Sequence, residues 1–311
     1  MGCKVRFKNL HERIISIKTK FLASTVFLAL IVLATSCAFA GTDTKYTDKL
    51  VILMYHDIVE NDAPTLSITE TQEKFCSDIR YLLLSGYKPV FLSEIEPGKI
   101  TPDMVCITFD DGYVNNYKLA YPVLKEFNVK AEINLIVNNI DNYPAFLTWD
   151  MCREMQESGL VEFGSHTYNA HNPDNSGEWR SSNVNGVQRF RGESDKDYKE
   201  RVVDDIYKSC EIMTEELQVK PEIFAYPFGA SDKYSRETVE QLFSISLLTG
   251  AKTAAAKKNM YDLQRYNVGQ DVDISKILPP LNQTRTPKEL AQMIIKRSFI
   301  LRFYNSLMRK K

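Results

Sequence analysis

Two adjacent carboxylates, Asp110 and Asp111, lie where this sequence has its clearest potential for chemistry. They follow an apolar, strand-like run over 104–109 and precede a Gly-Tyr pair. Side chains alternate along a strand, so two neighbours at its end can take different roles. Two anions side by side repel each other and tolerate burial only beside positive charge. A metal ion would supply that charge, with one carboxylate as its ligand and the other as a base. The alternative is a plain Asp-Asp-Gly turn.

Histidine positions favour the metal over the turn. Of the four histidines, His11 belongs to the N-terminal leader, and His56, His166 and His171 fall at predicted strand ends or just beyond. On a helix, residues five apart diverge by about 140°, so His166 and His171 share a metal only if they lie in a loop. One carboxylate and two imidazoles suit zinc or a similar divalent ion and leave positions open for water and substrate.

The remaining groups then match a hydrolytic reaction. The second carboxylate could take a proton from water, and a third histidine could protonate the leaving group. Together with a metal that activates water and polarises a carbonyl, these parts describe hydrolysis of an amide or an ester. A hydrogen-bonded structural histidine is the alternative for each imidazole taken singly. A two-histidine, one-carboxylate iron oxygenase is a further alternative, which the second aspartate and the α/β alternation oppose.

Alternating strands and helices are expected to position these residues. Strand-like segments occur at 50–55, 104–109, 131–137, 160–165, 223–229, 244–249 and 262–268. Helical periodicity occurs at 71–85, 113–127, 148–158, 198–217, 233–242 and 287–303, with Pro122 expected to kink or shorten its helix. This order predicts one parallel α/β domain, and no glycine-rich phosphate motif follows the first strand. A closed or nearly closed barrel fits best, with its chemistry at the carboxyl ends of the strands.

Composition limits the class of partner. The chain has 311 residues, 44% of them hydrophobic and 25% charged, which is typical of a globular protein. The first 40 residues hold six basic side chains and one acidic one, leaving 33 basic and 39 acidic residues in 41–311, a net charge of −6. Such a balance argues against nucleic acid as a partner. We expect a monomer.

The N-terminus reads as an export signal. A basic start precedes an apolar core over 21–33, and Ala38-Phe39-Ala40 forms an A-x-A cleavage pattern before Gly41. We therefore expect a signal peptide or signal anchor over 1–40, a barrel over 41–285, and a C-terminal helix with a basic tail over 286–311. The protein would be extracellular, periplasmic or anchored at the outer face of the inner membrane, with membrane association through the N-terminus. Cysteine spacing leaves disulfides and free thiols equally open.

The run Thr108-Phe109-Asp110-Asp111-Gly112, the His-Thr pair at His166 with a second histidine at His171, and Tyr226-Pro227-Phe228-Gly229 resemble the polysaccharide deacetylases, carbohydrate esterase family 4. The resemblance covers most of 50–270 and implies a distorted (β/α)7 barrel in a single domain that removes acetyl groups from N-acetylated sugar polymers. It also implies Asp110 as general base, Asp111, His166 and His171 as metal ligands, and the backbone N–H of Phe228 as an oxyanion donor. The metal would be zinc, with cobalt, nickel or iron as alternatives.

Three departures from the family pattern refine this interpretation. The histidine pair is five residues apart rather than four, which resembles the branch that deacetylates poly-β-1,6-N-acetylglucosamine. Ala225 stands where the usual arginine precedes the motif proline, and Arg265 is our substitute partner for the base. No histidine follows His171; the same branch has a permuted order with its acid histidine on the first strand, so we assign His56 as general acid. Asp271, Asp273 or Asp57 would orient it.

Aromatic residues are candidates for contact with sugar rings. Tyr226, Trp149 and Trp179 are the three proposed here, because aromatic faces suit the apolar sides of pyranoses. Packing in the core or in a loop is the alternative for each. The predicted function is metal-dependent N-deacetylation of a polymer containing N-acetylglucosamine, either poly-N-acetylglucosamine or peptidoglycan. The alternatives are an inactive carbohydrate-binding barrel and an acetyl esterase acting on xylan.

Overall fold

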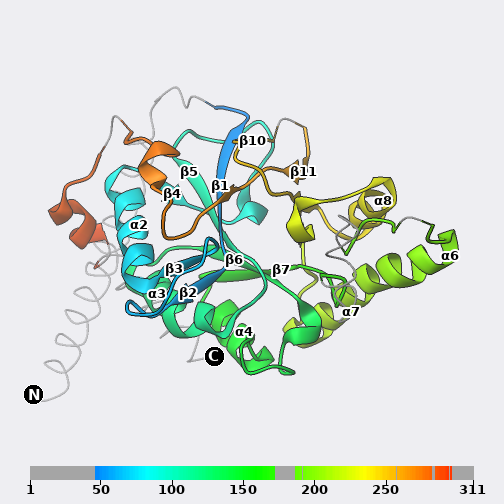
Figure 1. Ribbon diagram of the computed structural model, residues 1–311. Coiled ribbons are helices and arrows are strands. Elements are labelled where there is room, and N and C mark those ends of the chain that lie inside the picture. Colours follow the sequence, from blue (N-terminus) through cyan, green and yellow to red (C-terminus); the bar gives the residue numbers. More distant parts are fainter. Residues whose placement is uncertain are drawn as a thin grey trace, which may run out of the picture. The chain divides into compact units, whose positions relative to one another are not determined.

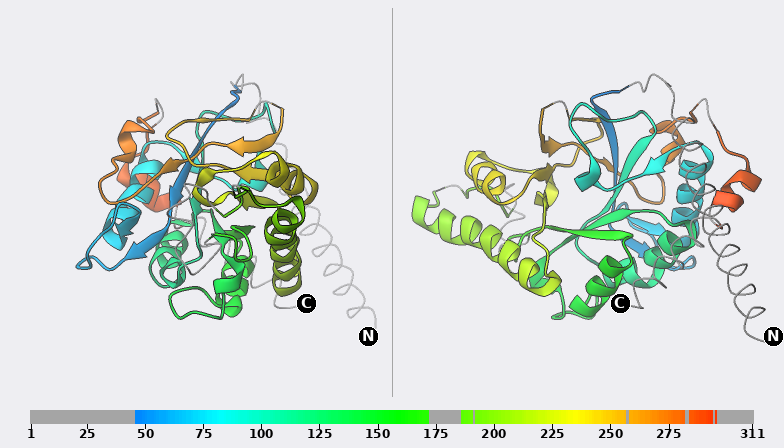
Figure 2. Two further views of the ribbon diagram at one scale, coloured as in Figure 1. Left: turned by 45° about the vertical axis from the view of Figure 1, so that its right-hand side comes forward. Right: turned by 180° about the vertical axis from the view of Figure 1, so that it is seen from behind.

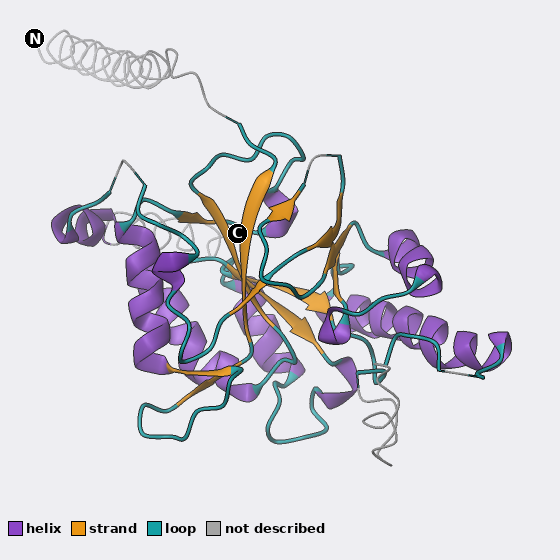
Figure 3. Ribbon diagram, turned by 45° about the horizontal axis from the view of Figure 1, so that its top comes forward, coloured by secondary structure: helices purple, strands orange, loops and turns teal. Residues whose placement is uncertain are grey.

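Parallel strands paired edge to edge form the centre of the molecule (Figures 1 and 3). The computed structural model describes residues 46–171, 186–190, 192–256, 258–281, 284–293 and 295. The expected leader over 1–40, Trp179 and the basic end of the chain lie outside these residues. None of the helices in the described part of the chain is both long and apolar enough to cross a bilayer.

One path of eight strands gives the sheet its barrel-like curvature. Its order is β10 (Ala254–Ala255), β1 (Lys49–Tyr55), β5 (Met104–Phe109), β6 (Ala131–Leu135), β7 (Val161–Ser165), β8 (Ile223–Ala225), β9 (Ile245–Leu247) and β11 (Met260–Leu263). Only the β10–β1 pair on this path is antiparallel. After β11, the chain crosses to the other end of the sheet, where β12 (Tyr266–Asn267) pairs in parallel with β1. The sheet is therefore a nearly closed barrel in a single domain, which confirms the predicted fold class.

Helices cover the outside of the sheet (Figures 1 and 2). They are α2 (Gln72–Leu84), α3 (Tyr121–Phe127), α4 (Trp149–Glu157), α6 (Asp195–Tyr198), α7 (Asp204–Leu217) and α8 (Lys233–Leu242), with π-helical turns η2 (Asn116–Ala120) and η4 (Lys199–Val203). Short 3-10 turns are η1 (Leu92–Glu94), η3 (Val137–Asn139), η5 (Pro227–Gly229) and η6 (Ile274–Lys276). Three short strands complete the fold: β2 (Asp57–Val59) pairs with β3 (Thr69–Thr71), and β4 (Lys88–Pro89) pairs with β5.

Buried side chains form separate inner and outer cores. The inner cluster contains Leu50, Ile52, Cys106, Ala225 and Leu247, which come from four strands of the barrel. Leu92 of η1 packs into the same cluster from the loop after β4. Two further clusters outside the sheet bury the apolar faces of α2, α3 and α4 on one side and of α7 and α8 on another. The strand ends that carry the polar groups are therefore held from both faces of the sheet.

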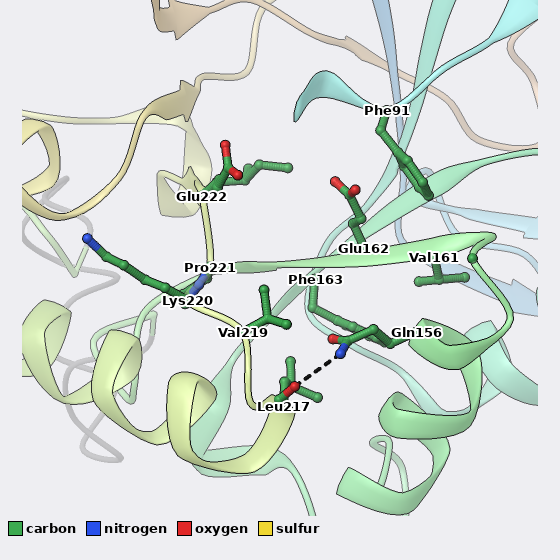
Figure 4. A pocket seen from close by; sticks show the side chains of 12 residues that line it. Phe91, Gln156, Val161, Glu162, Phe163, Leu217, Val219, Lys220, Pro221 and Glu222 are labelled. Atoms are coloured by element: carbon green, nitrogen blue, oxygen red, sulfur yellow. Dashed lines mark hydrogen bonds between the residues drawn. The ribbon is translucent and has the colours of Figure 1, made fainter. Parts of the chain in front are cut away.

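A pocket of about 250 Å³ lies at the amino ends of the central strands (Figure 4). Val161 and Ile223, the first residues of β7 and β8, are part of its lining. The wall also includes Glu162 and Glu222. This pocket is at the opposite end of the strands from the carboxylates and histidines discussed above.

Several predicted strands are shorter than expected: those predicted over 131–137 and 244–249 are Ala131–Leu135 and Ile245–Leu247. The strand predicted over 223–229 ends at Ala225, because Pro227, which has no N–H, begins the 3-10 turn η5. The strand predicted over 262–268 is split into β11 and β12, with Gln264 and Arg265 between them. The helix predicted over 113–127 becomes η2 followed by α3, whose first turn holds Pro122. The four cysteines in the described residues, Cys76, Cys106, Cys152 and Cys210, are free thiols.

Candidate metal centre and active site

Asp110 and Asp111 diverge at the end of β5. The Asp110 N–H donates to the carbonyl of Tyr55 at 3.0 Å, so the pairing with β1 extends one residue beyond the strand. Asp110 is 2% exposed, and Arg265 contacts both its carboxylate and the Thr108 hydroxyl two residues earlier. Asp111 has a φ of 73°, a left-handed conformation that is uncommon for a residue with a side chain. This change in backbone conformation ends the strand and directs the two carboxylates to different partners.

Arg265 is the partner of Asp110. Its Nη1 and Nη2 donate to Asp110 Oδ1 and Oδ2, both at 2.7 Å, and its Nε donates to the Leu248 carbonyl at 3.1 Å. Asn134 of β6 adds a bond to Oδ1 at 2.8 Å. Burial alone would raise the pKa of Asp110, but the Arg265 charge, with His166 and His56 nearby, holds it well below its usual range. Asp110 is therefore an anion fixed in place.

Asp111, His166 and His171 form a second group beside this pair. Their candidate ligand atoms all lie within 4.8 Å of one another. The Nε2 atoms of His166 and His171 are 3.6 Å and 3.5 Å from Asp111 Oδ1. Both distances are longer than a good hydrogen bond. Three converging ligand atoms at this spacing leave room for one cation between them.

The state of each group fits a divalent metal ion. Asp111 Oδ1 is buried and has no hydrogen-bond partner among the described residues. His166 Nδ1 lies 2.8 Å from the Ala225 carbonyl, an acceptor, so the proton sits on Nδ1 and Nε2 keeps its lone pair for a metal. Burial lowers the pKa of His166 to about 3, so the ring is neutral. Burial, with repulsion from Asp110, raises the pKa of Asp111 to about 6. A nearby cation would lower this pKa again and stabilise the ionised carboxylate.

His56 joins the site from the end of β1. Its backbone carbonyl accepts a bond from Asn116 Nδ2 at 2.8 Å. Tyr55 and Phe109 are opposite each other in the parallel pair β1–β5, so His56 and Asp110 follow neighbouring strand ends. A positive charge on the His56 ring would favour ionisation of both Asp110 and Asp111. Its Nδ1 has no hydrogen-bond partner among the described residues. Of the three aspartates proposed to orient His56, Asp273 uses its side chain to cap η6 and to bond Ser275. Orientation of His56 by Asp271 or Asp57 stays a prediction.

Phe228 lies beside His171. Its φ of 57° is again left-handed, within the turn η5 after β8. The ring is half-exposed, and its centroid is 4.7 Å from that of His171. The motif residue therefore reaches the rim of the metal group, and the oxyanion role of its N–H stays a prediction.

Two of the proposed sugar-contacting residues are wrong. Tyr226 is 1% exposed and packs edge to face against Phe224 with ring centroids 5.1 Å apart, in the core beneath α7 and α8. Trp149 is 7% exposed at the start of α4 and belongs to the outer core. Neither ring offers a face to a polymer, because each fills space between a helix and the sheet. Trp179 lies outside the described residues.

Sequence reasoning missed Asn134 and Asp205. Asn134 holds Asp110, and Asp205 of α7 accepts hydrogen bonds from the backbone of the loop between His166 and His171. A signal for Asn134 was present: Glu132 and Asn134 alternate with apolar residues in an otherwise buried strand. Polar residues at alternate positions of a buried strand share one face, here the barrel interior. Asp205 carries no such signal, since an acidic residue in the first turn of a helix is common.

Comparison with known proteins places these residues in a wider group. The polysaccharide deacetylase family matches residues 98–243, a range that includes the Asp pair, the His pair and Phe228. The poly-β-1,6-N-acetyl-D-glucosamine N-deacetylase of Escherichia coli (strain K12) is 27% identical over 218 residues, 62% of this chain and 32% of that protein. The Staphylococcus aureus (strain MSSA476) protein of the same name is 27% identical over 168 residues, 51% of this chain and 53% of that protein. The chain thus spans about a third and about half of these relatives.

Solved structures share the fold. A de-N-acetylase from Aggregatibacter actinomycetemcomitans superposes with a TM-score of 0.62 at 24% identity, covering 75% of this chain and 100% of that one. IcaB from Ammonifex degensii gives a TM-score of 0.58 at 22% identity, covering 80% and 97%. At these identities the likeness is one of architecture.

Proposed function

This chain belongs to the polysaccharide deacetylase family of hydrolases, and on that premise we propose that it removes N-acetyl groups from poly-β-1,6-N-acetylglucosamine. The observation that carries the proposal is the convergence of Asp111, His166 and His171 beside the Asp110–Arg265 pair. The choice of polymer is supported by the names of the E. coli and S. aureus relatives and by the five-residue histidine spacing.

Asp111, His166 and His171 would hold the metal ion. Zinc is our first choice, because one carboxylate and two imidazoles are ligands that it favours; cobalt, nickel or iron are alternatives. A divalent ion in this position supplies Lewis acidity for the attack of water on an amide carbonyl.

Asp110 would act as the general base. It stays ionised at neutral pH, and the bonds from Arg265 and Asn134 occupy three of its four lone-pair positions, leaving one on Oδ2 for a proton from water. Its low pKa makes it a weak base, so it depends on the metal to make the water acidic.

The other two roles fall to the rim residues. His56, which follows the strand end next to that of Asp110, would donate a proton to the leaving amine. The Phe228 N–H would stabilise negative charge that develops on the carbonyl oxygen. These groups sit at the carboxyl ends of β1, β5, β7 and β8, where barrel enzymes place their chemistry.

The location of the protein is also a proposal. We propose export through the leader over 1–40, since the apolar run and the Ala38-Phe39-Ala40 pattern are typical of a signal peptide or an anchor. An exported enzyme would meet its polymer outside the cytoplasm.

Acetate release from defined oligosaccharides tests the function. We expect the metal-loaded protein to release acetate from β-1,6-linked N-acetylglucosamine oligomers faster than from β-1,4-linked ones, from peptidoglycan or from acetylated xylan. Binding of the oligomer without acetate release would make the protein a sugar-binding barrel. Release from xylan alone would make it an esterase. Release from peptidoglycan alone would make peptidoglycan the substrate in place of poly-β-1,6-N-acetylglucosamine.

A further inference from the structure

The loop that carries His171 has an unusual backbone. After β7 the chain passes through His166 and then Thr167, whose φ is 79°. A left-handed conformation is a genuine outlier for a β-branched residue, so the surroundings must impose it. The loop must also turn back within five residues to bring the two imidazole rings to a centroid distance of 4.9 Å.

Asp205, in the first turn of α7, holds the middle of this loop. Its Oδ1 accepts the N–H of Tyr168 at 2.8 Å, and its Oδ2 accepts the N–H of Asn169 at 2.7 Å. One side chain therefore accepts hydrogen bonds from two consecutive backbone N–H groups of the segment that joins the two histidines. Lys208 lies three residues after Asp205 on the same helix, and its Nζ is 3.7 Å from the centre of the Tyr168 ring.

The other side of the loop is held by the same helix. Gly186 packs so closely that a Cβ atom there would overlap the carbonyl oxygen of Ala170. Arg201 donates to the carbonyls of Gly186 and, at 2.8 Å, of Gln188, and it pairs with Glu193. Arg201 and Asp205 are four residues apart in the continuous helical stretch of α6, η4 and α7, so they occupy one face of it. Figure 2 shows this stretch lying beside α8, to which α7 is packed.

We propose that Asp205 is a positioning residue for the metal site, which fixes the backbone of Tyr168 and Asn169 in the turn that brings His171 beside His166. The inference rests on the proposed function only through the metal ion, because it concerns how the ligands are held and not what the site hydrolyses. A carboxylate is needed because it has two acceptor oxygens, and each of them accepts a backbone N–H of the loop. In Asp205→Asn, the amide nitrogen would face a backbone N–H, donor against donor.

Cobalt affinity tests the proposal without substrate. Metal-free wild type, Asp205→Asn, Asp205→Glu and Asp204→Asn would be titrated with Co²⁺ against a competing chelator, with the visible absorption of the bound ion recorded. Asp204→Asn is the matched control, since Asp204 is the exposed neighbour on the same helical turn. Mutation of a group that orients metal ligands typically weakens metal affinity 10–100-fold. We expect that weakening, with an altered absorption spectrum, for both Asp205 variants, and a Kd within about twofold of wild type for Asp204→Asn.

Each other outcome decides the matter. A wild-type Kd and spectrum in either Asp205 variant that folds would overturn the proposal, because the turn would then form without the carboxylate geometry. Failure of both Asp205 variants to fold, while His171→Ala folds, would also overturn it by making Asp205 a residue of general stability. Co²⁺ binding by wild type without acetate release would sink the proposed function and leave this proposal standing. Absence of Co²⁺ binding by wild type would sink both.

Discussion

The two ends of the barrel interior each bury a carboxylate, and the two are treated in opposite ways. Asp110, at the carboxyl end of β5, is 2% exposed and receives a two-bond contact from Arg265. Glu132, near the amino end of the adjacent strand β6, is fully buried, and the one hydrogen bond that its side chain accepts from the described residues comes from the backbone N–H of Leu92, at 2.5 Å. Its other oxygen has no hydrogen-bond partner among the described residues.

Nearby charge accounts for the difference. Burial raises the pKa of Glu132 well above its usual value, and the neighbouring carboxylates Glu162 and Glu94 raise it further. Glu162 of β7 is paired in register with Glu132 of β6, and it lines the pocket of Figure 4. Burial therefore favours the neutral form of Glu132, whereas the Arg265 charge favours the ionised form of Asp110. Burial of a carboxylate alone therefore does not identify a reactive site, and what distinguishes Asp110 from Glu132 is the cation built in beside it.

Removal of the anion at the carboxyl end is expected to have the largest effect. Asp110→Asn keeps the shape and removes the proton acceptor, so we expect acetate release to be abolished. Glu132→Gln makes the same chemical change at the other end and should retain activity close to wild type. Steady-state acetate assays of the two purified variants measure this contrast, and comparable losses in both would remove the distinction between the ends.

Loss of the general acid should be smaller than loss of the base. We expect His56→Ala to lower kcat by about 10²- to 10⁴-fold, the usual contribution of general acid catalysis. Metal content should not change, because His56 is not one of the three proposed ligands. Rates near wild type would return the acid role to another group or to water.

Removal of the built-in cation should lower stability rather than activity alone. Arg265→Met leaves Asp110 buried without its counter-charge, and breaking a buried pair in this way costs about 3–5 kcal/mol. The free energy of unfolding from urea titration at pH 7 measures the loss. Arg265→Lys keeps a charge and should lose less. A free energy within about 1 kcal/mol of wild type for Arg265→Met would show that the pair does not stabilise the fold.

At the amino end, the expected effect is a pH dependence of stability rather than a loss of activity. A carboxyl group whose pKa is raised by folding contributes stability that is fully present below its unfolded pKa, about 4.5, and is lost as pH rises towards the native pKa. Glu132→Gln cannot ionise, so its stability relative to wild type should increase with pH, by at most about 1.4 kcal/mol per pH unit. Urea midpoints at pH 5 and pH 8 measure this slope. A difference that does not change with pH would mean that Glu132 is not neutral in the folded protein.

Sequence patterns predicted the strand ends better than the closure of the barrel. Continuous apolar runs located β1 and β5 and placed His56 and Asp110 at their carboxyl ends, because a strand buried on both faces leaves a clear signature. The pairing of Arg265 with Asp110 was expected only as a substitute for a missing residue; the structure supplies the contact by splitting the last strand at that residue. Long-range closure of this kind has no local pattern.

Other features depend on tertiary packing and were missed or misjudged. Tyr226 and Trp149 resemble sugar-contacting residues in sequence, but helices bury both. The left-handed conformations of Asp111 and Thr167 also give no sequence signal, since turns of this kind usually use glycine. Asp205 is separated from His171 by more than thirty positions, and only the path of α7 brings it to the loop.

The metal content of two variants tests the central division of roles most directly. After loading with zinc and removal of the excess, the zinc-to-protein ratio would be measured for wild type, Asp110→Asn and His171→Ala. If Asp111, His166 and His171 hold the ion and Asp110 acts beside it, Asp110→Asn keeps one zinc per chain, as wild type does, and His171→Ala loses most of it. Equal loss of zinc in the two variants would contradict the account.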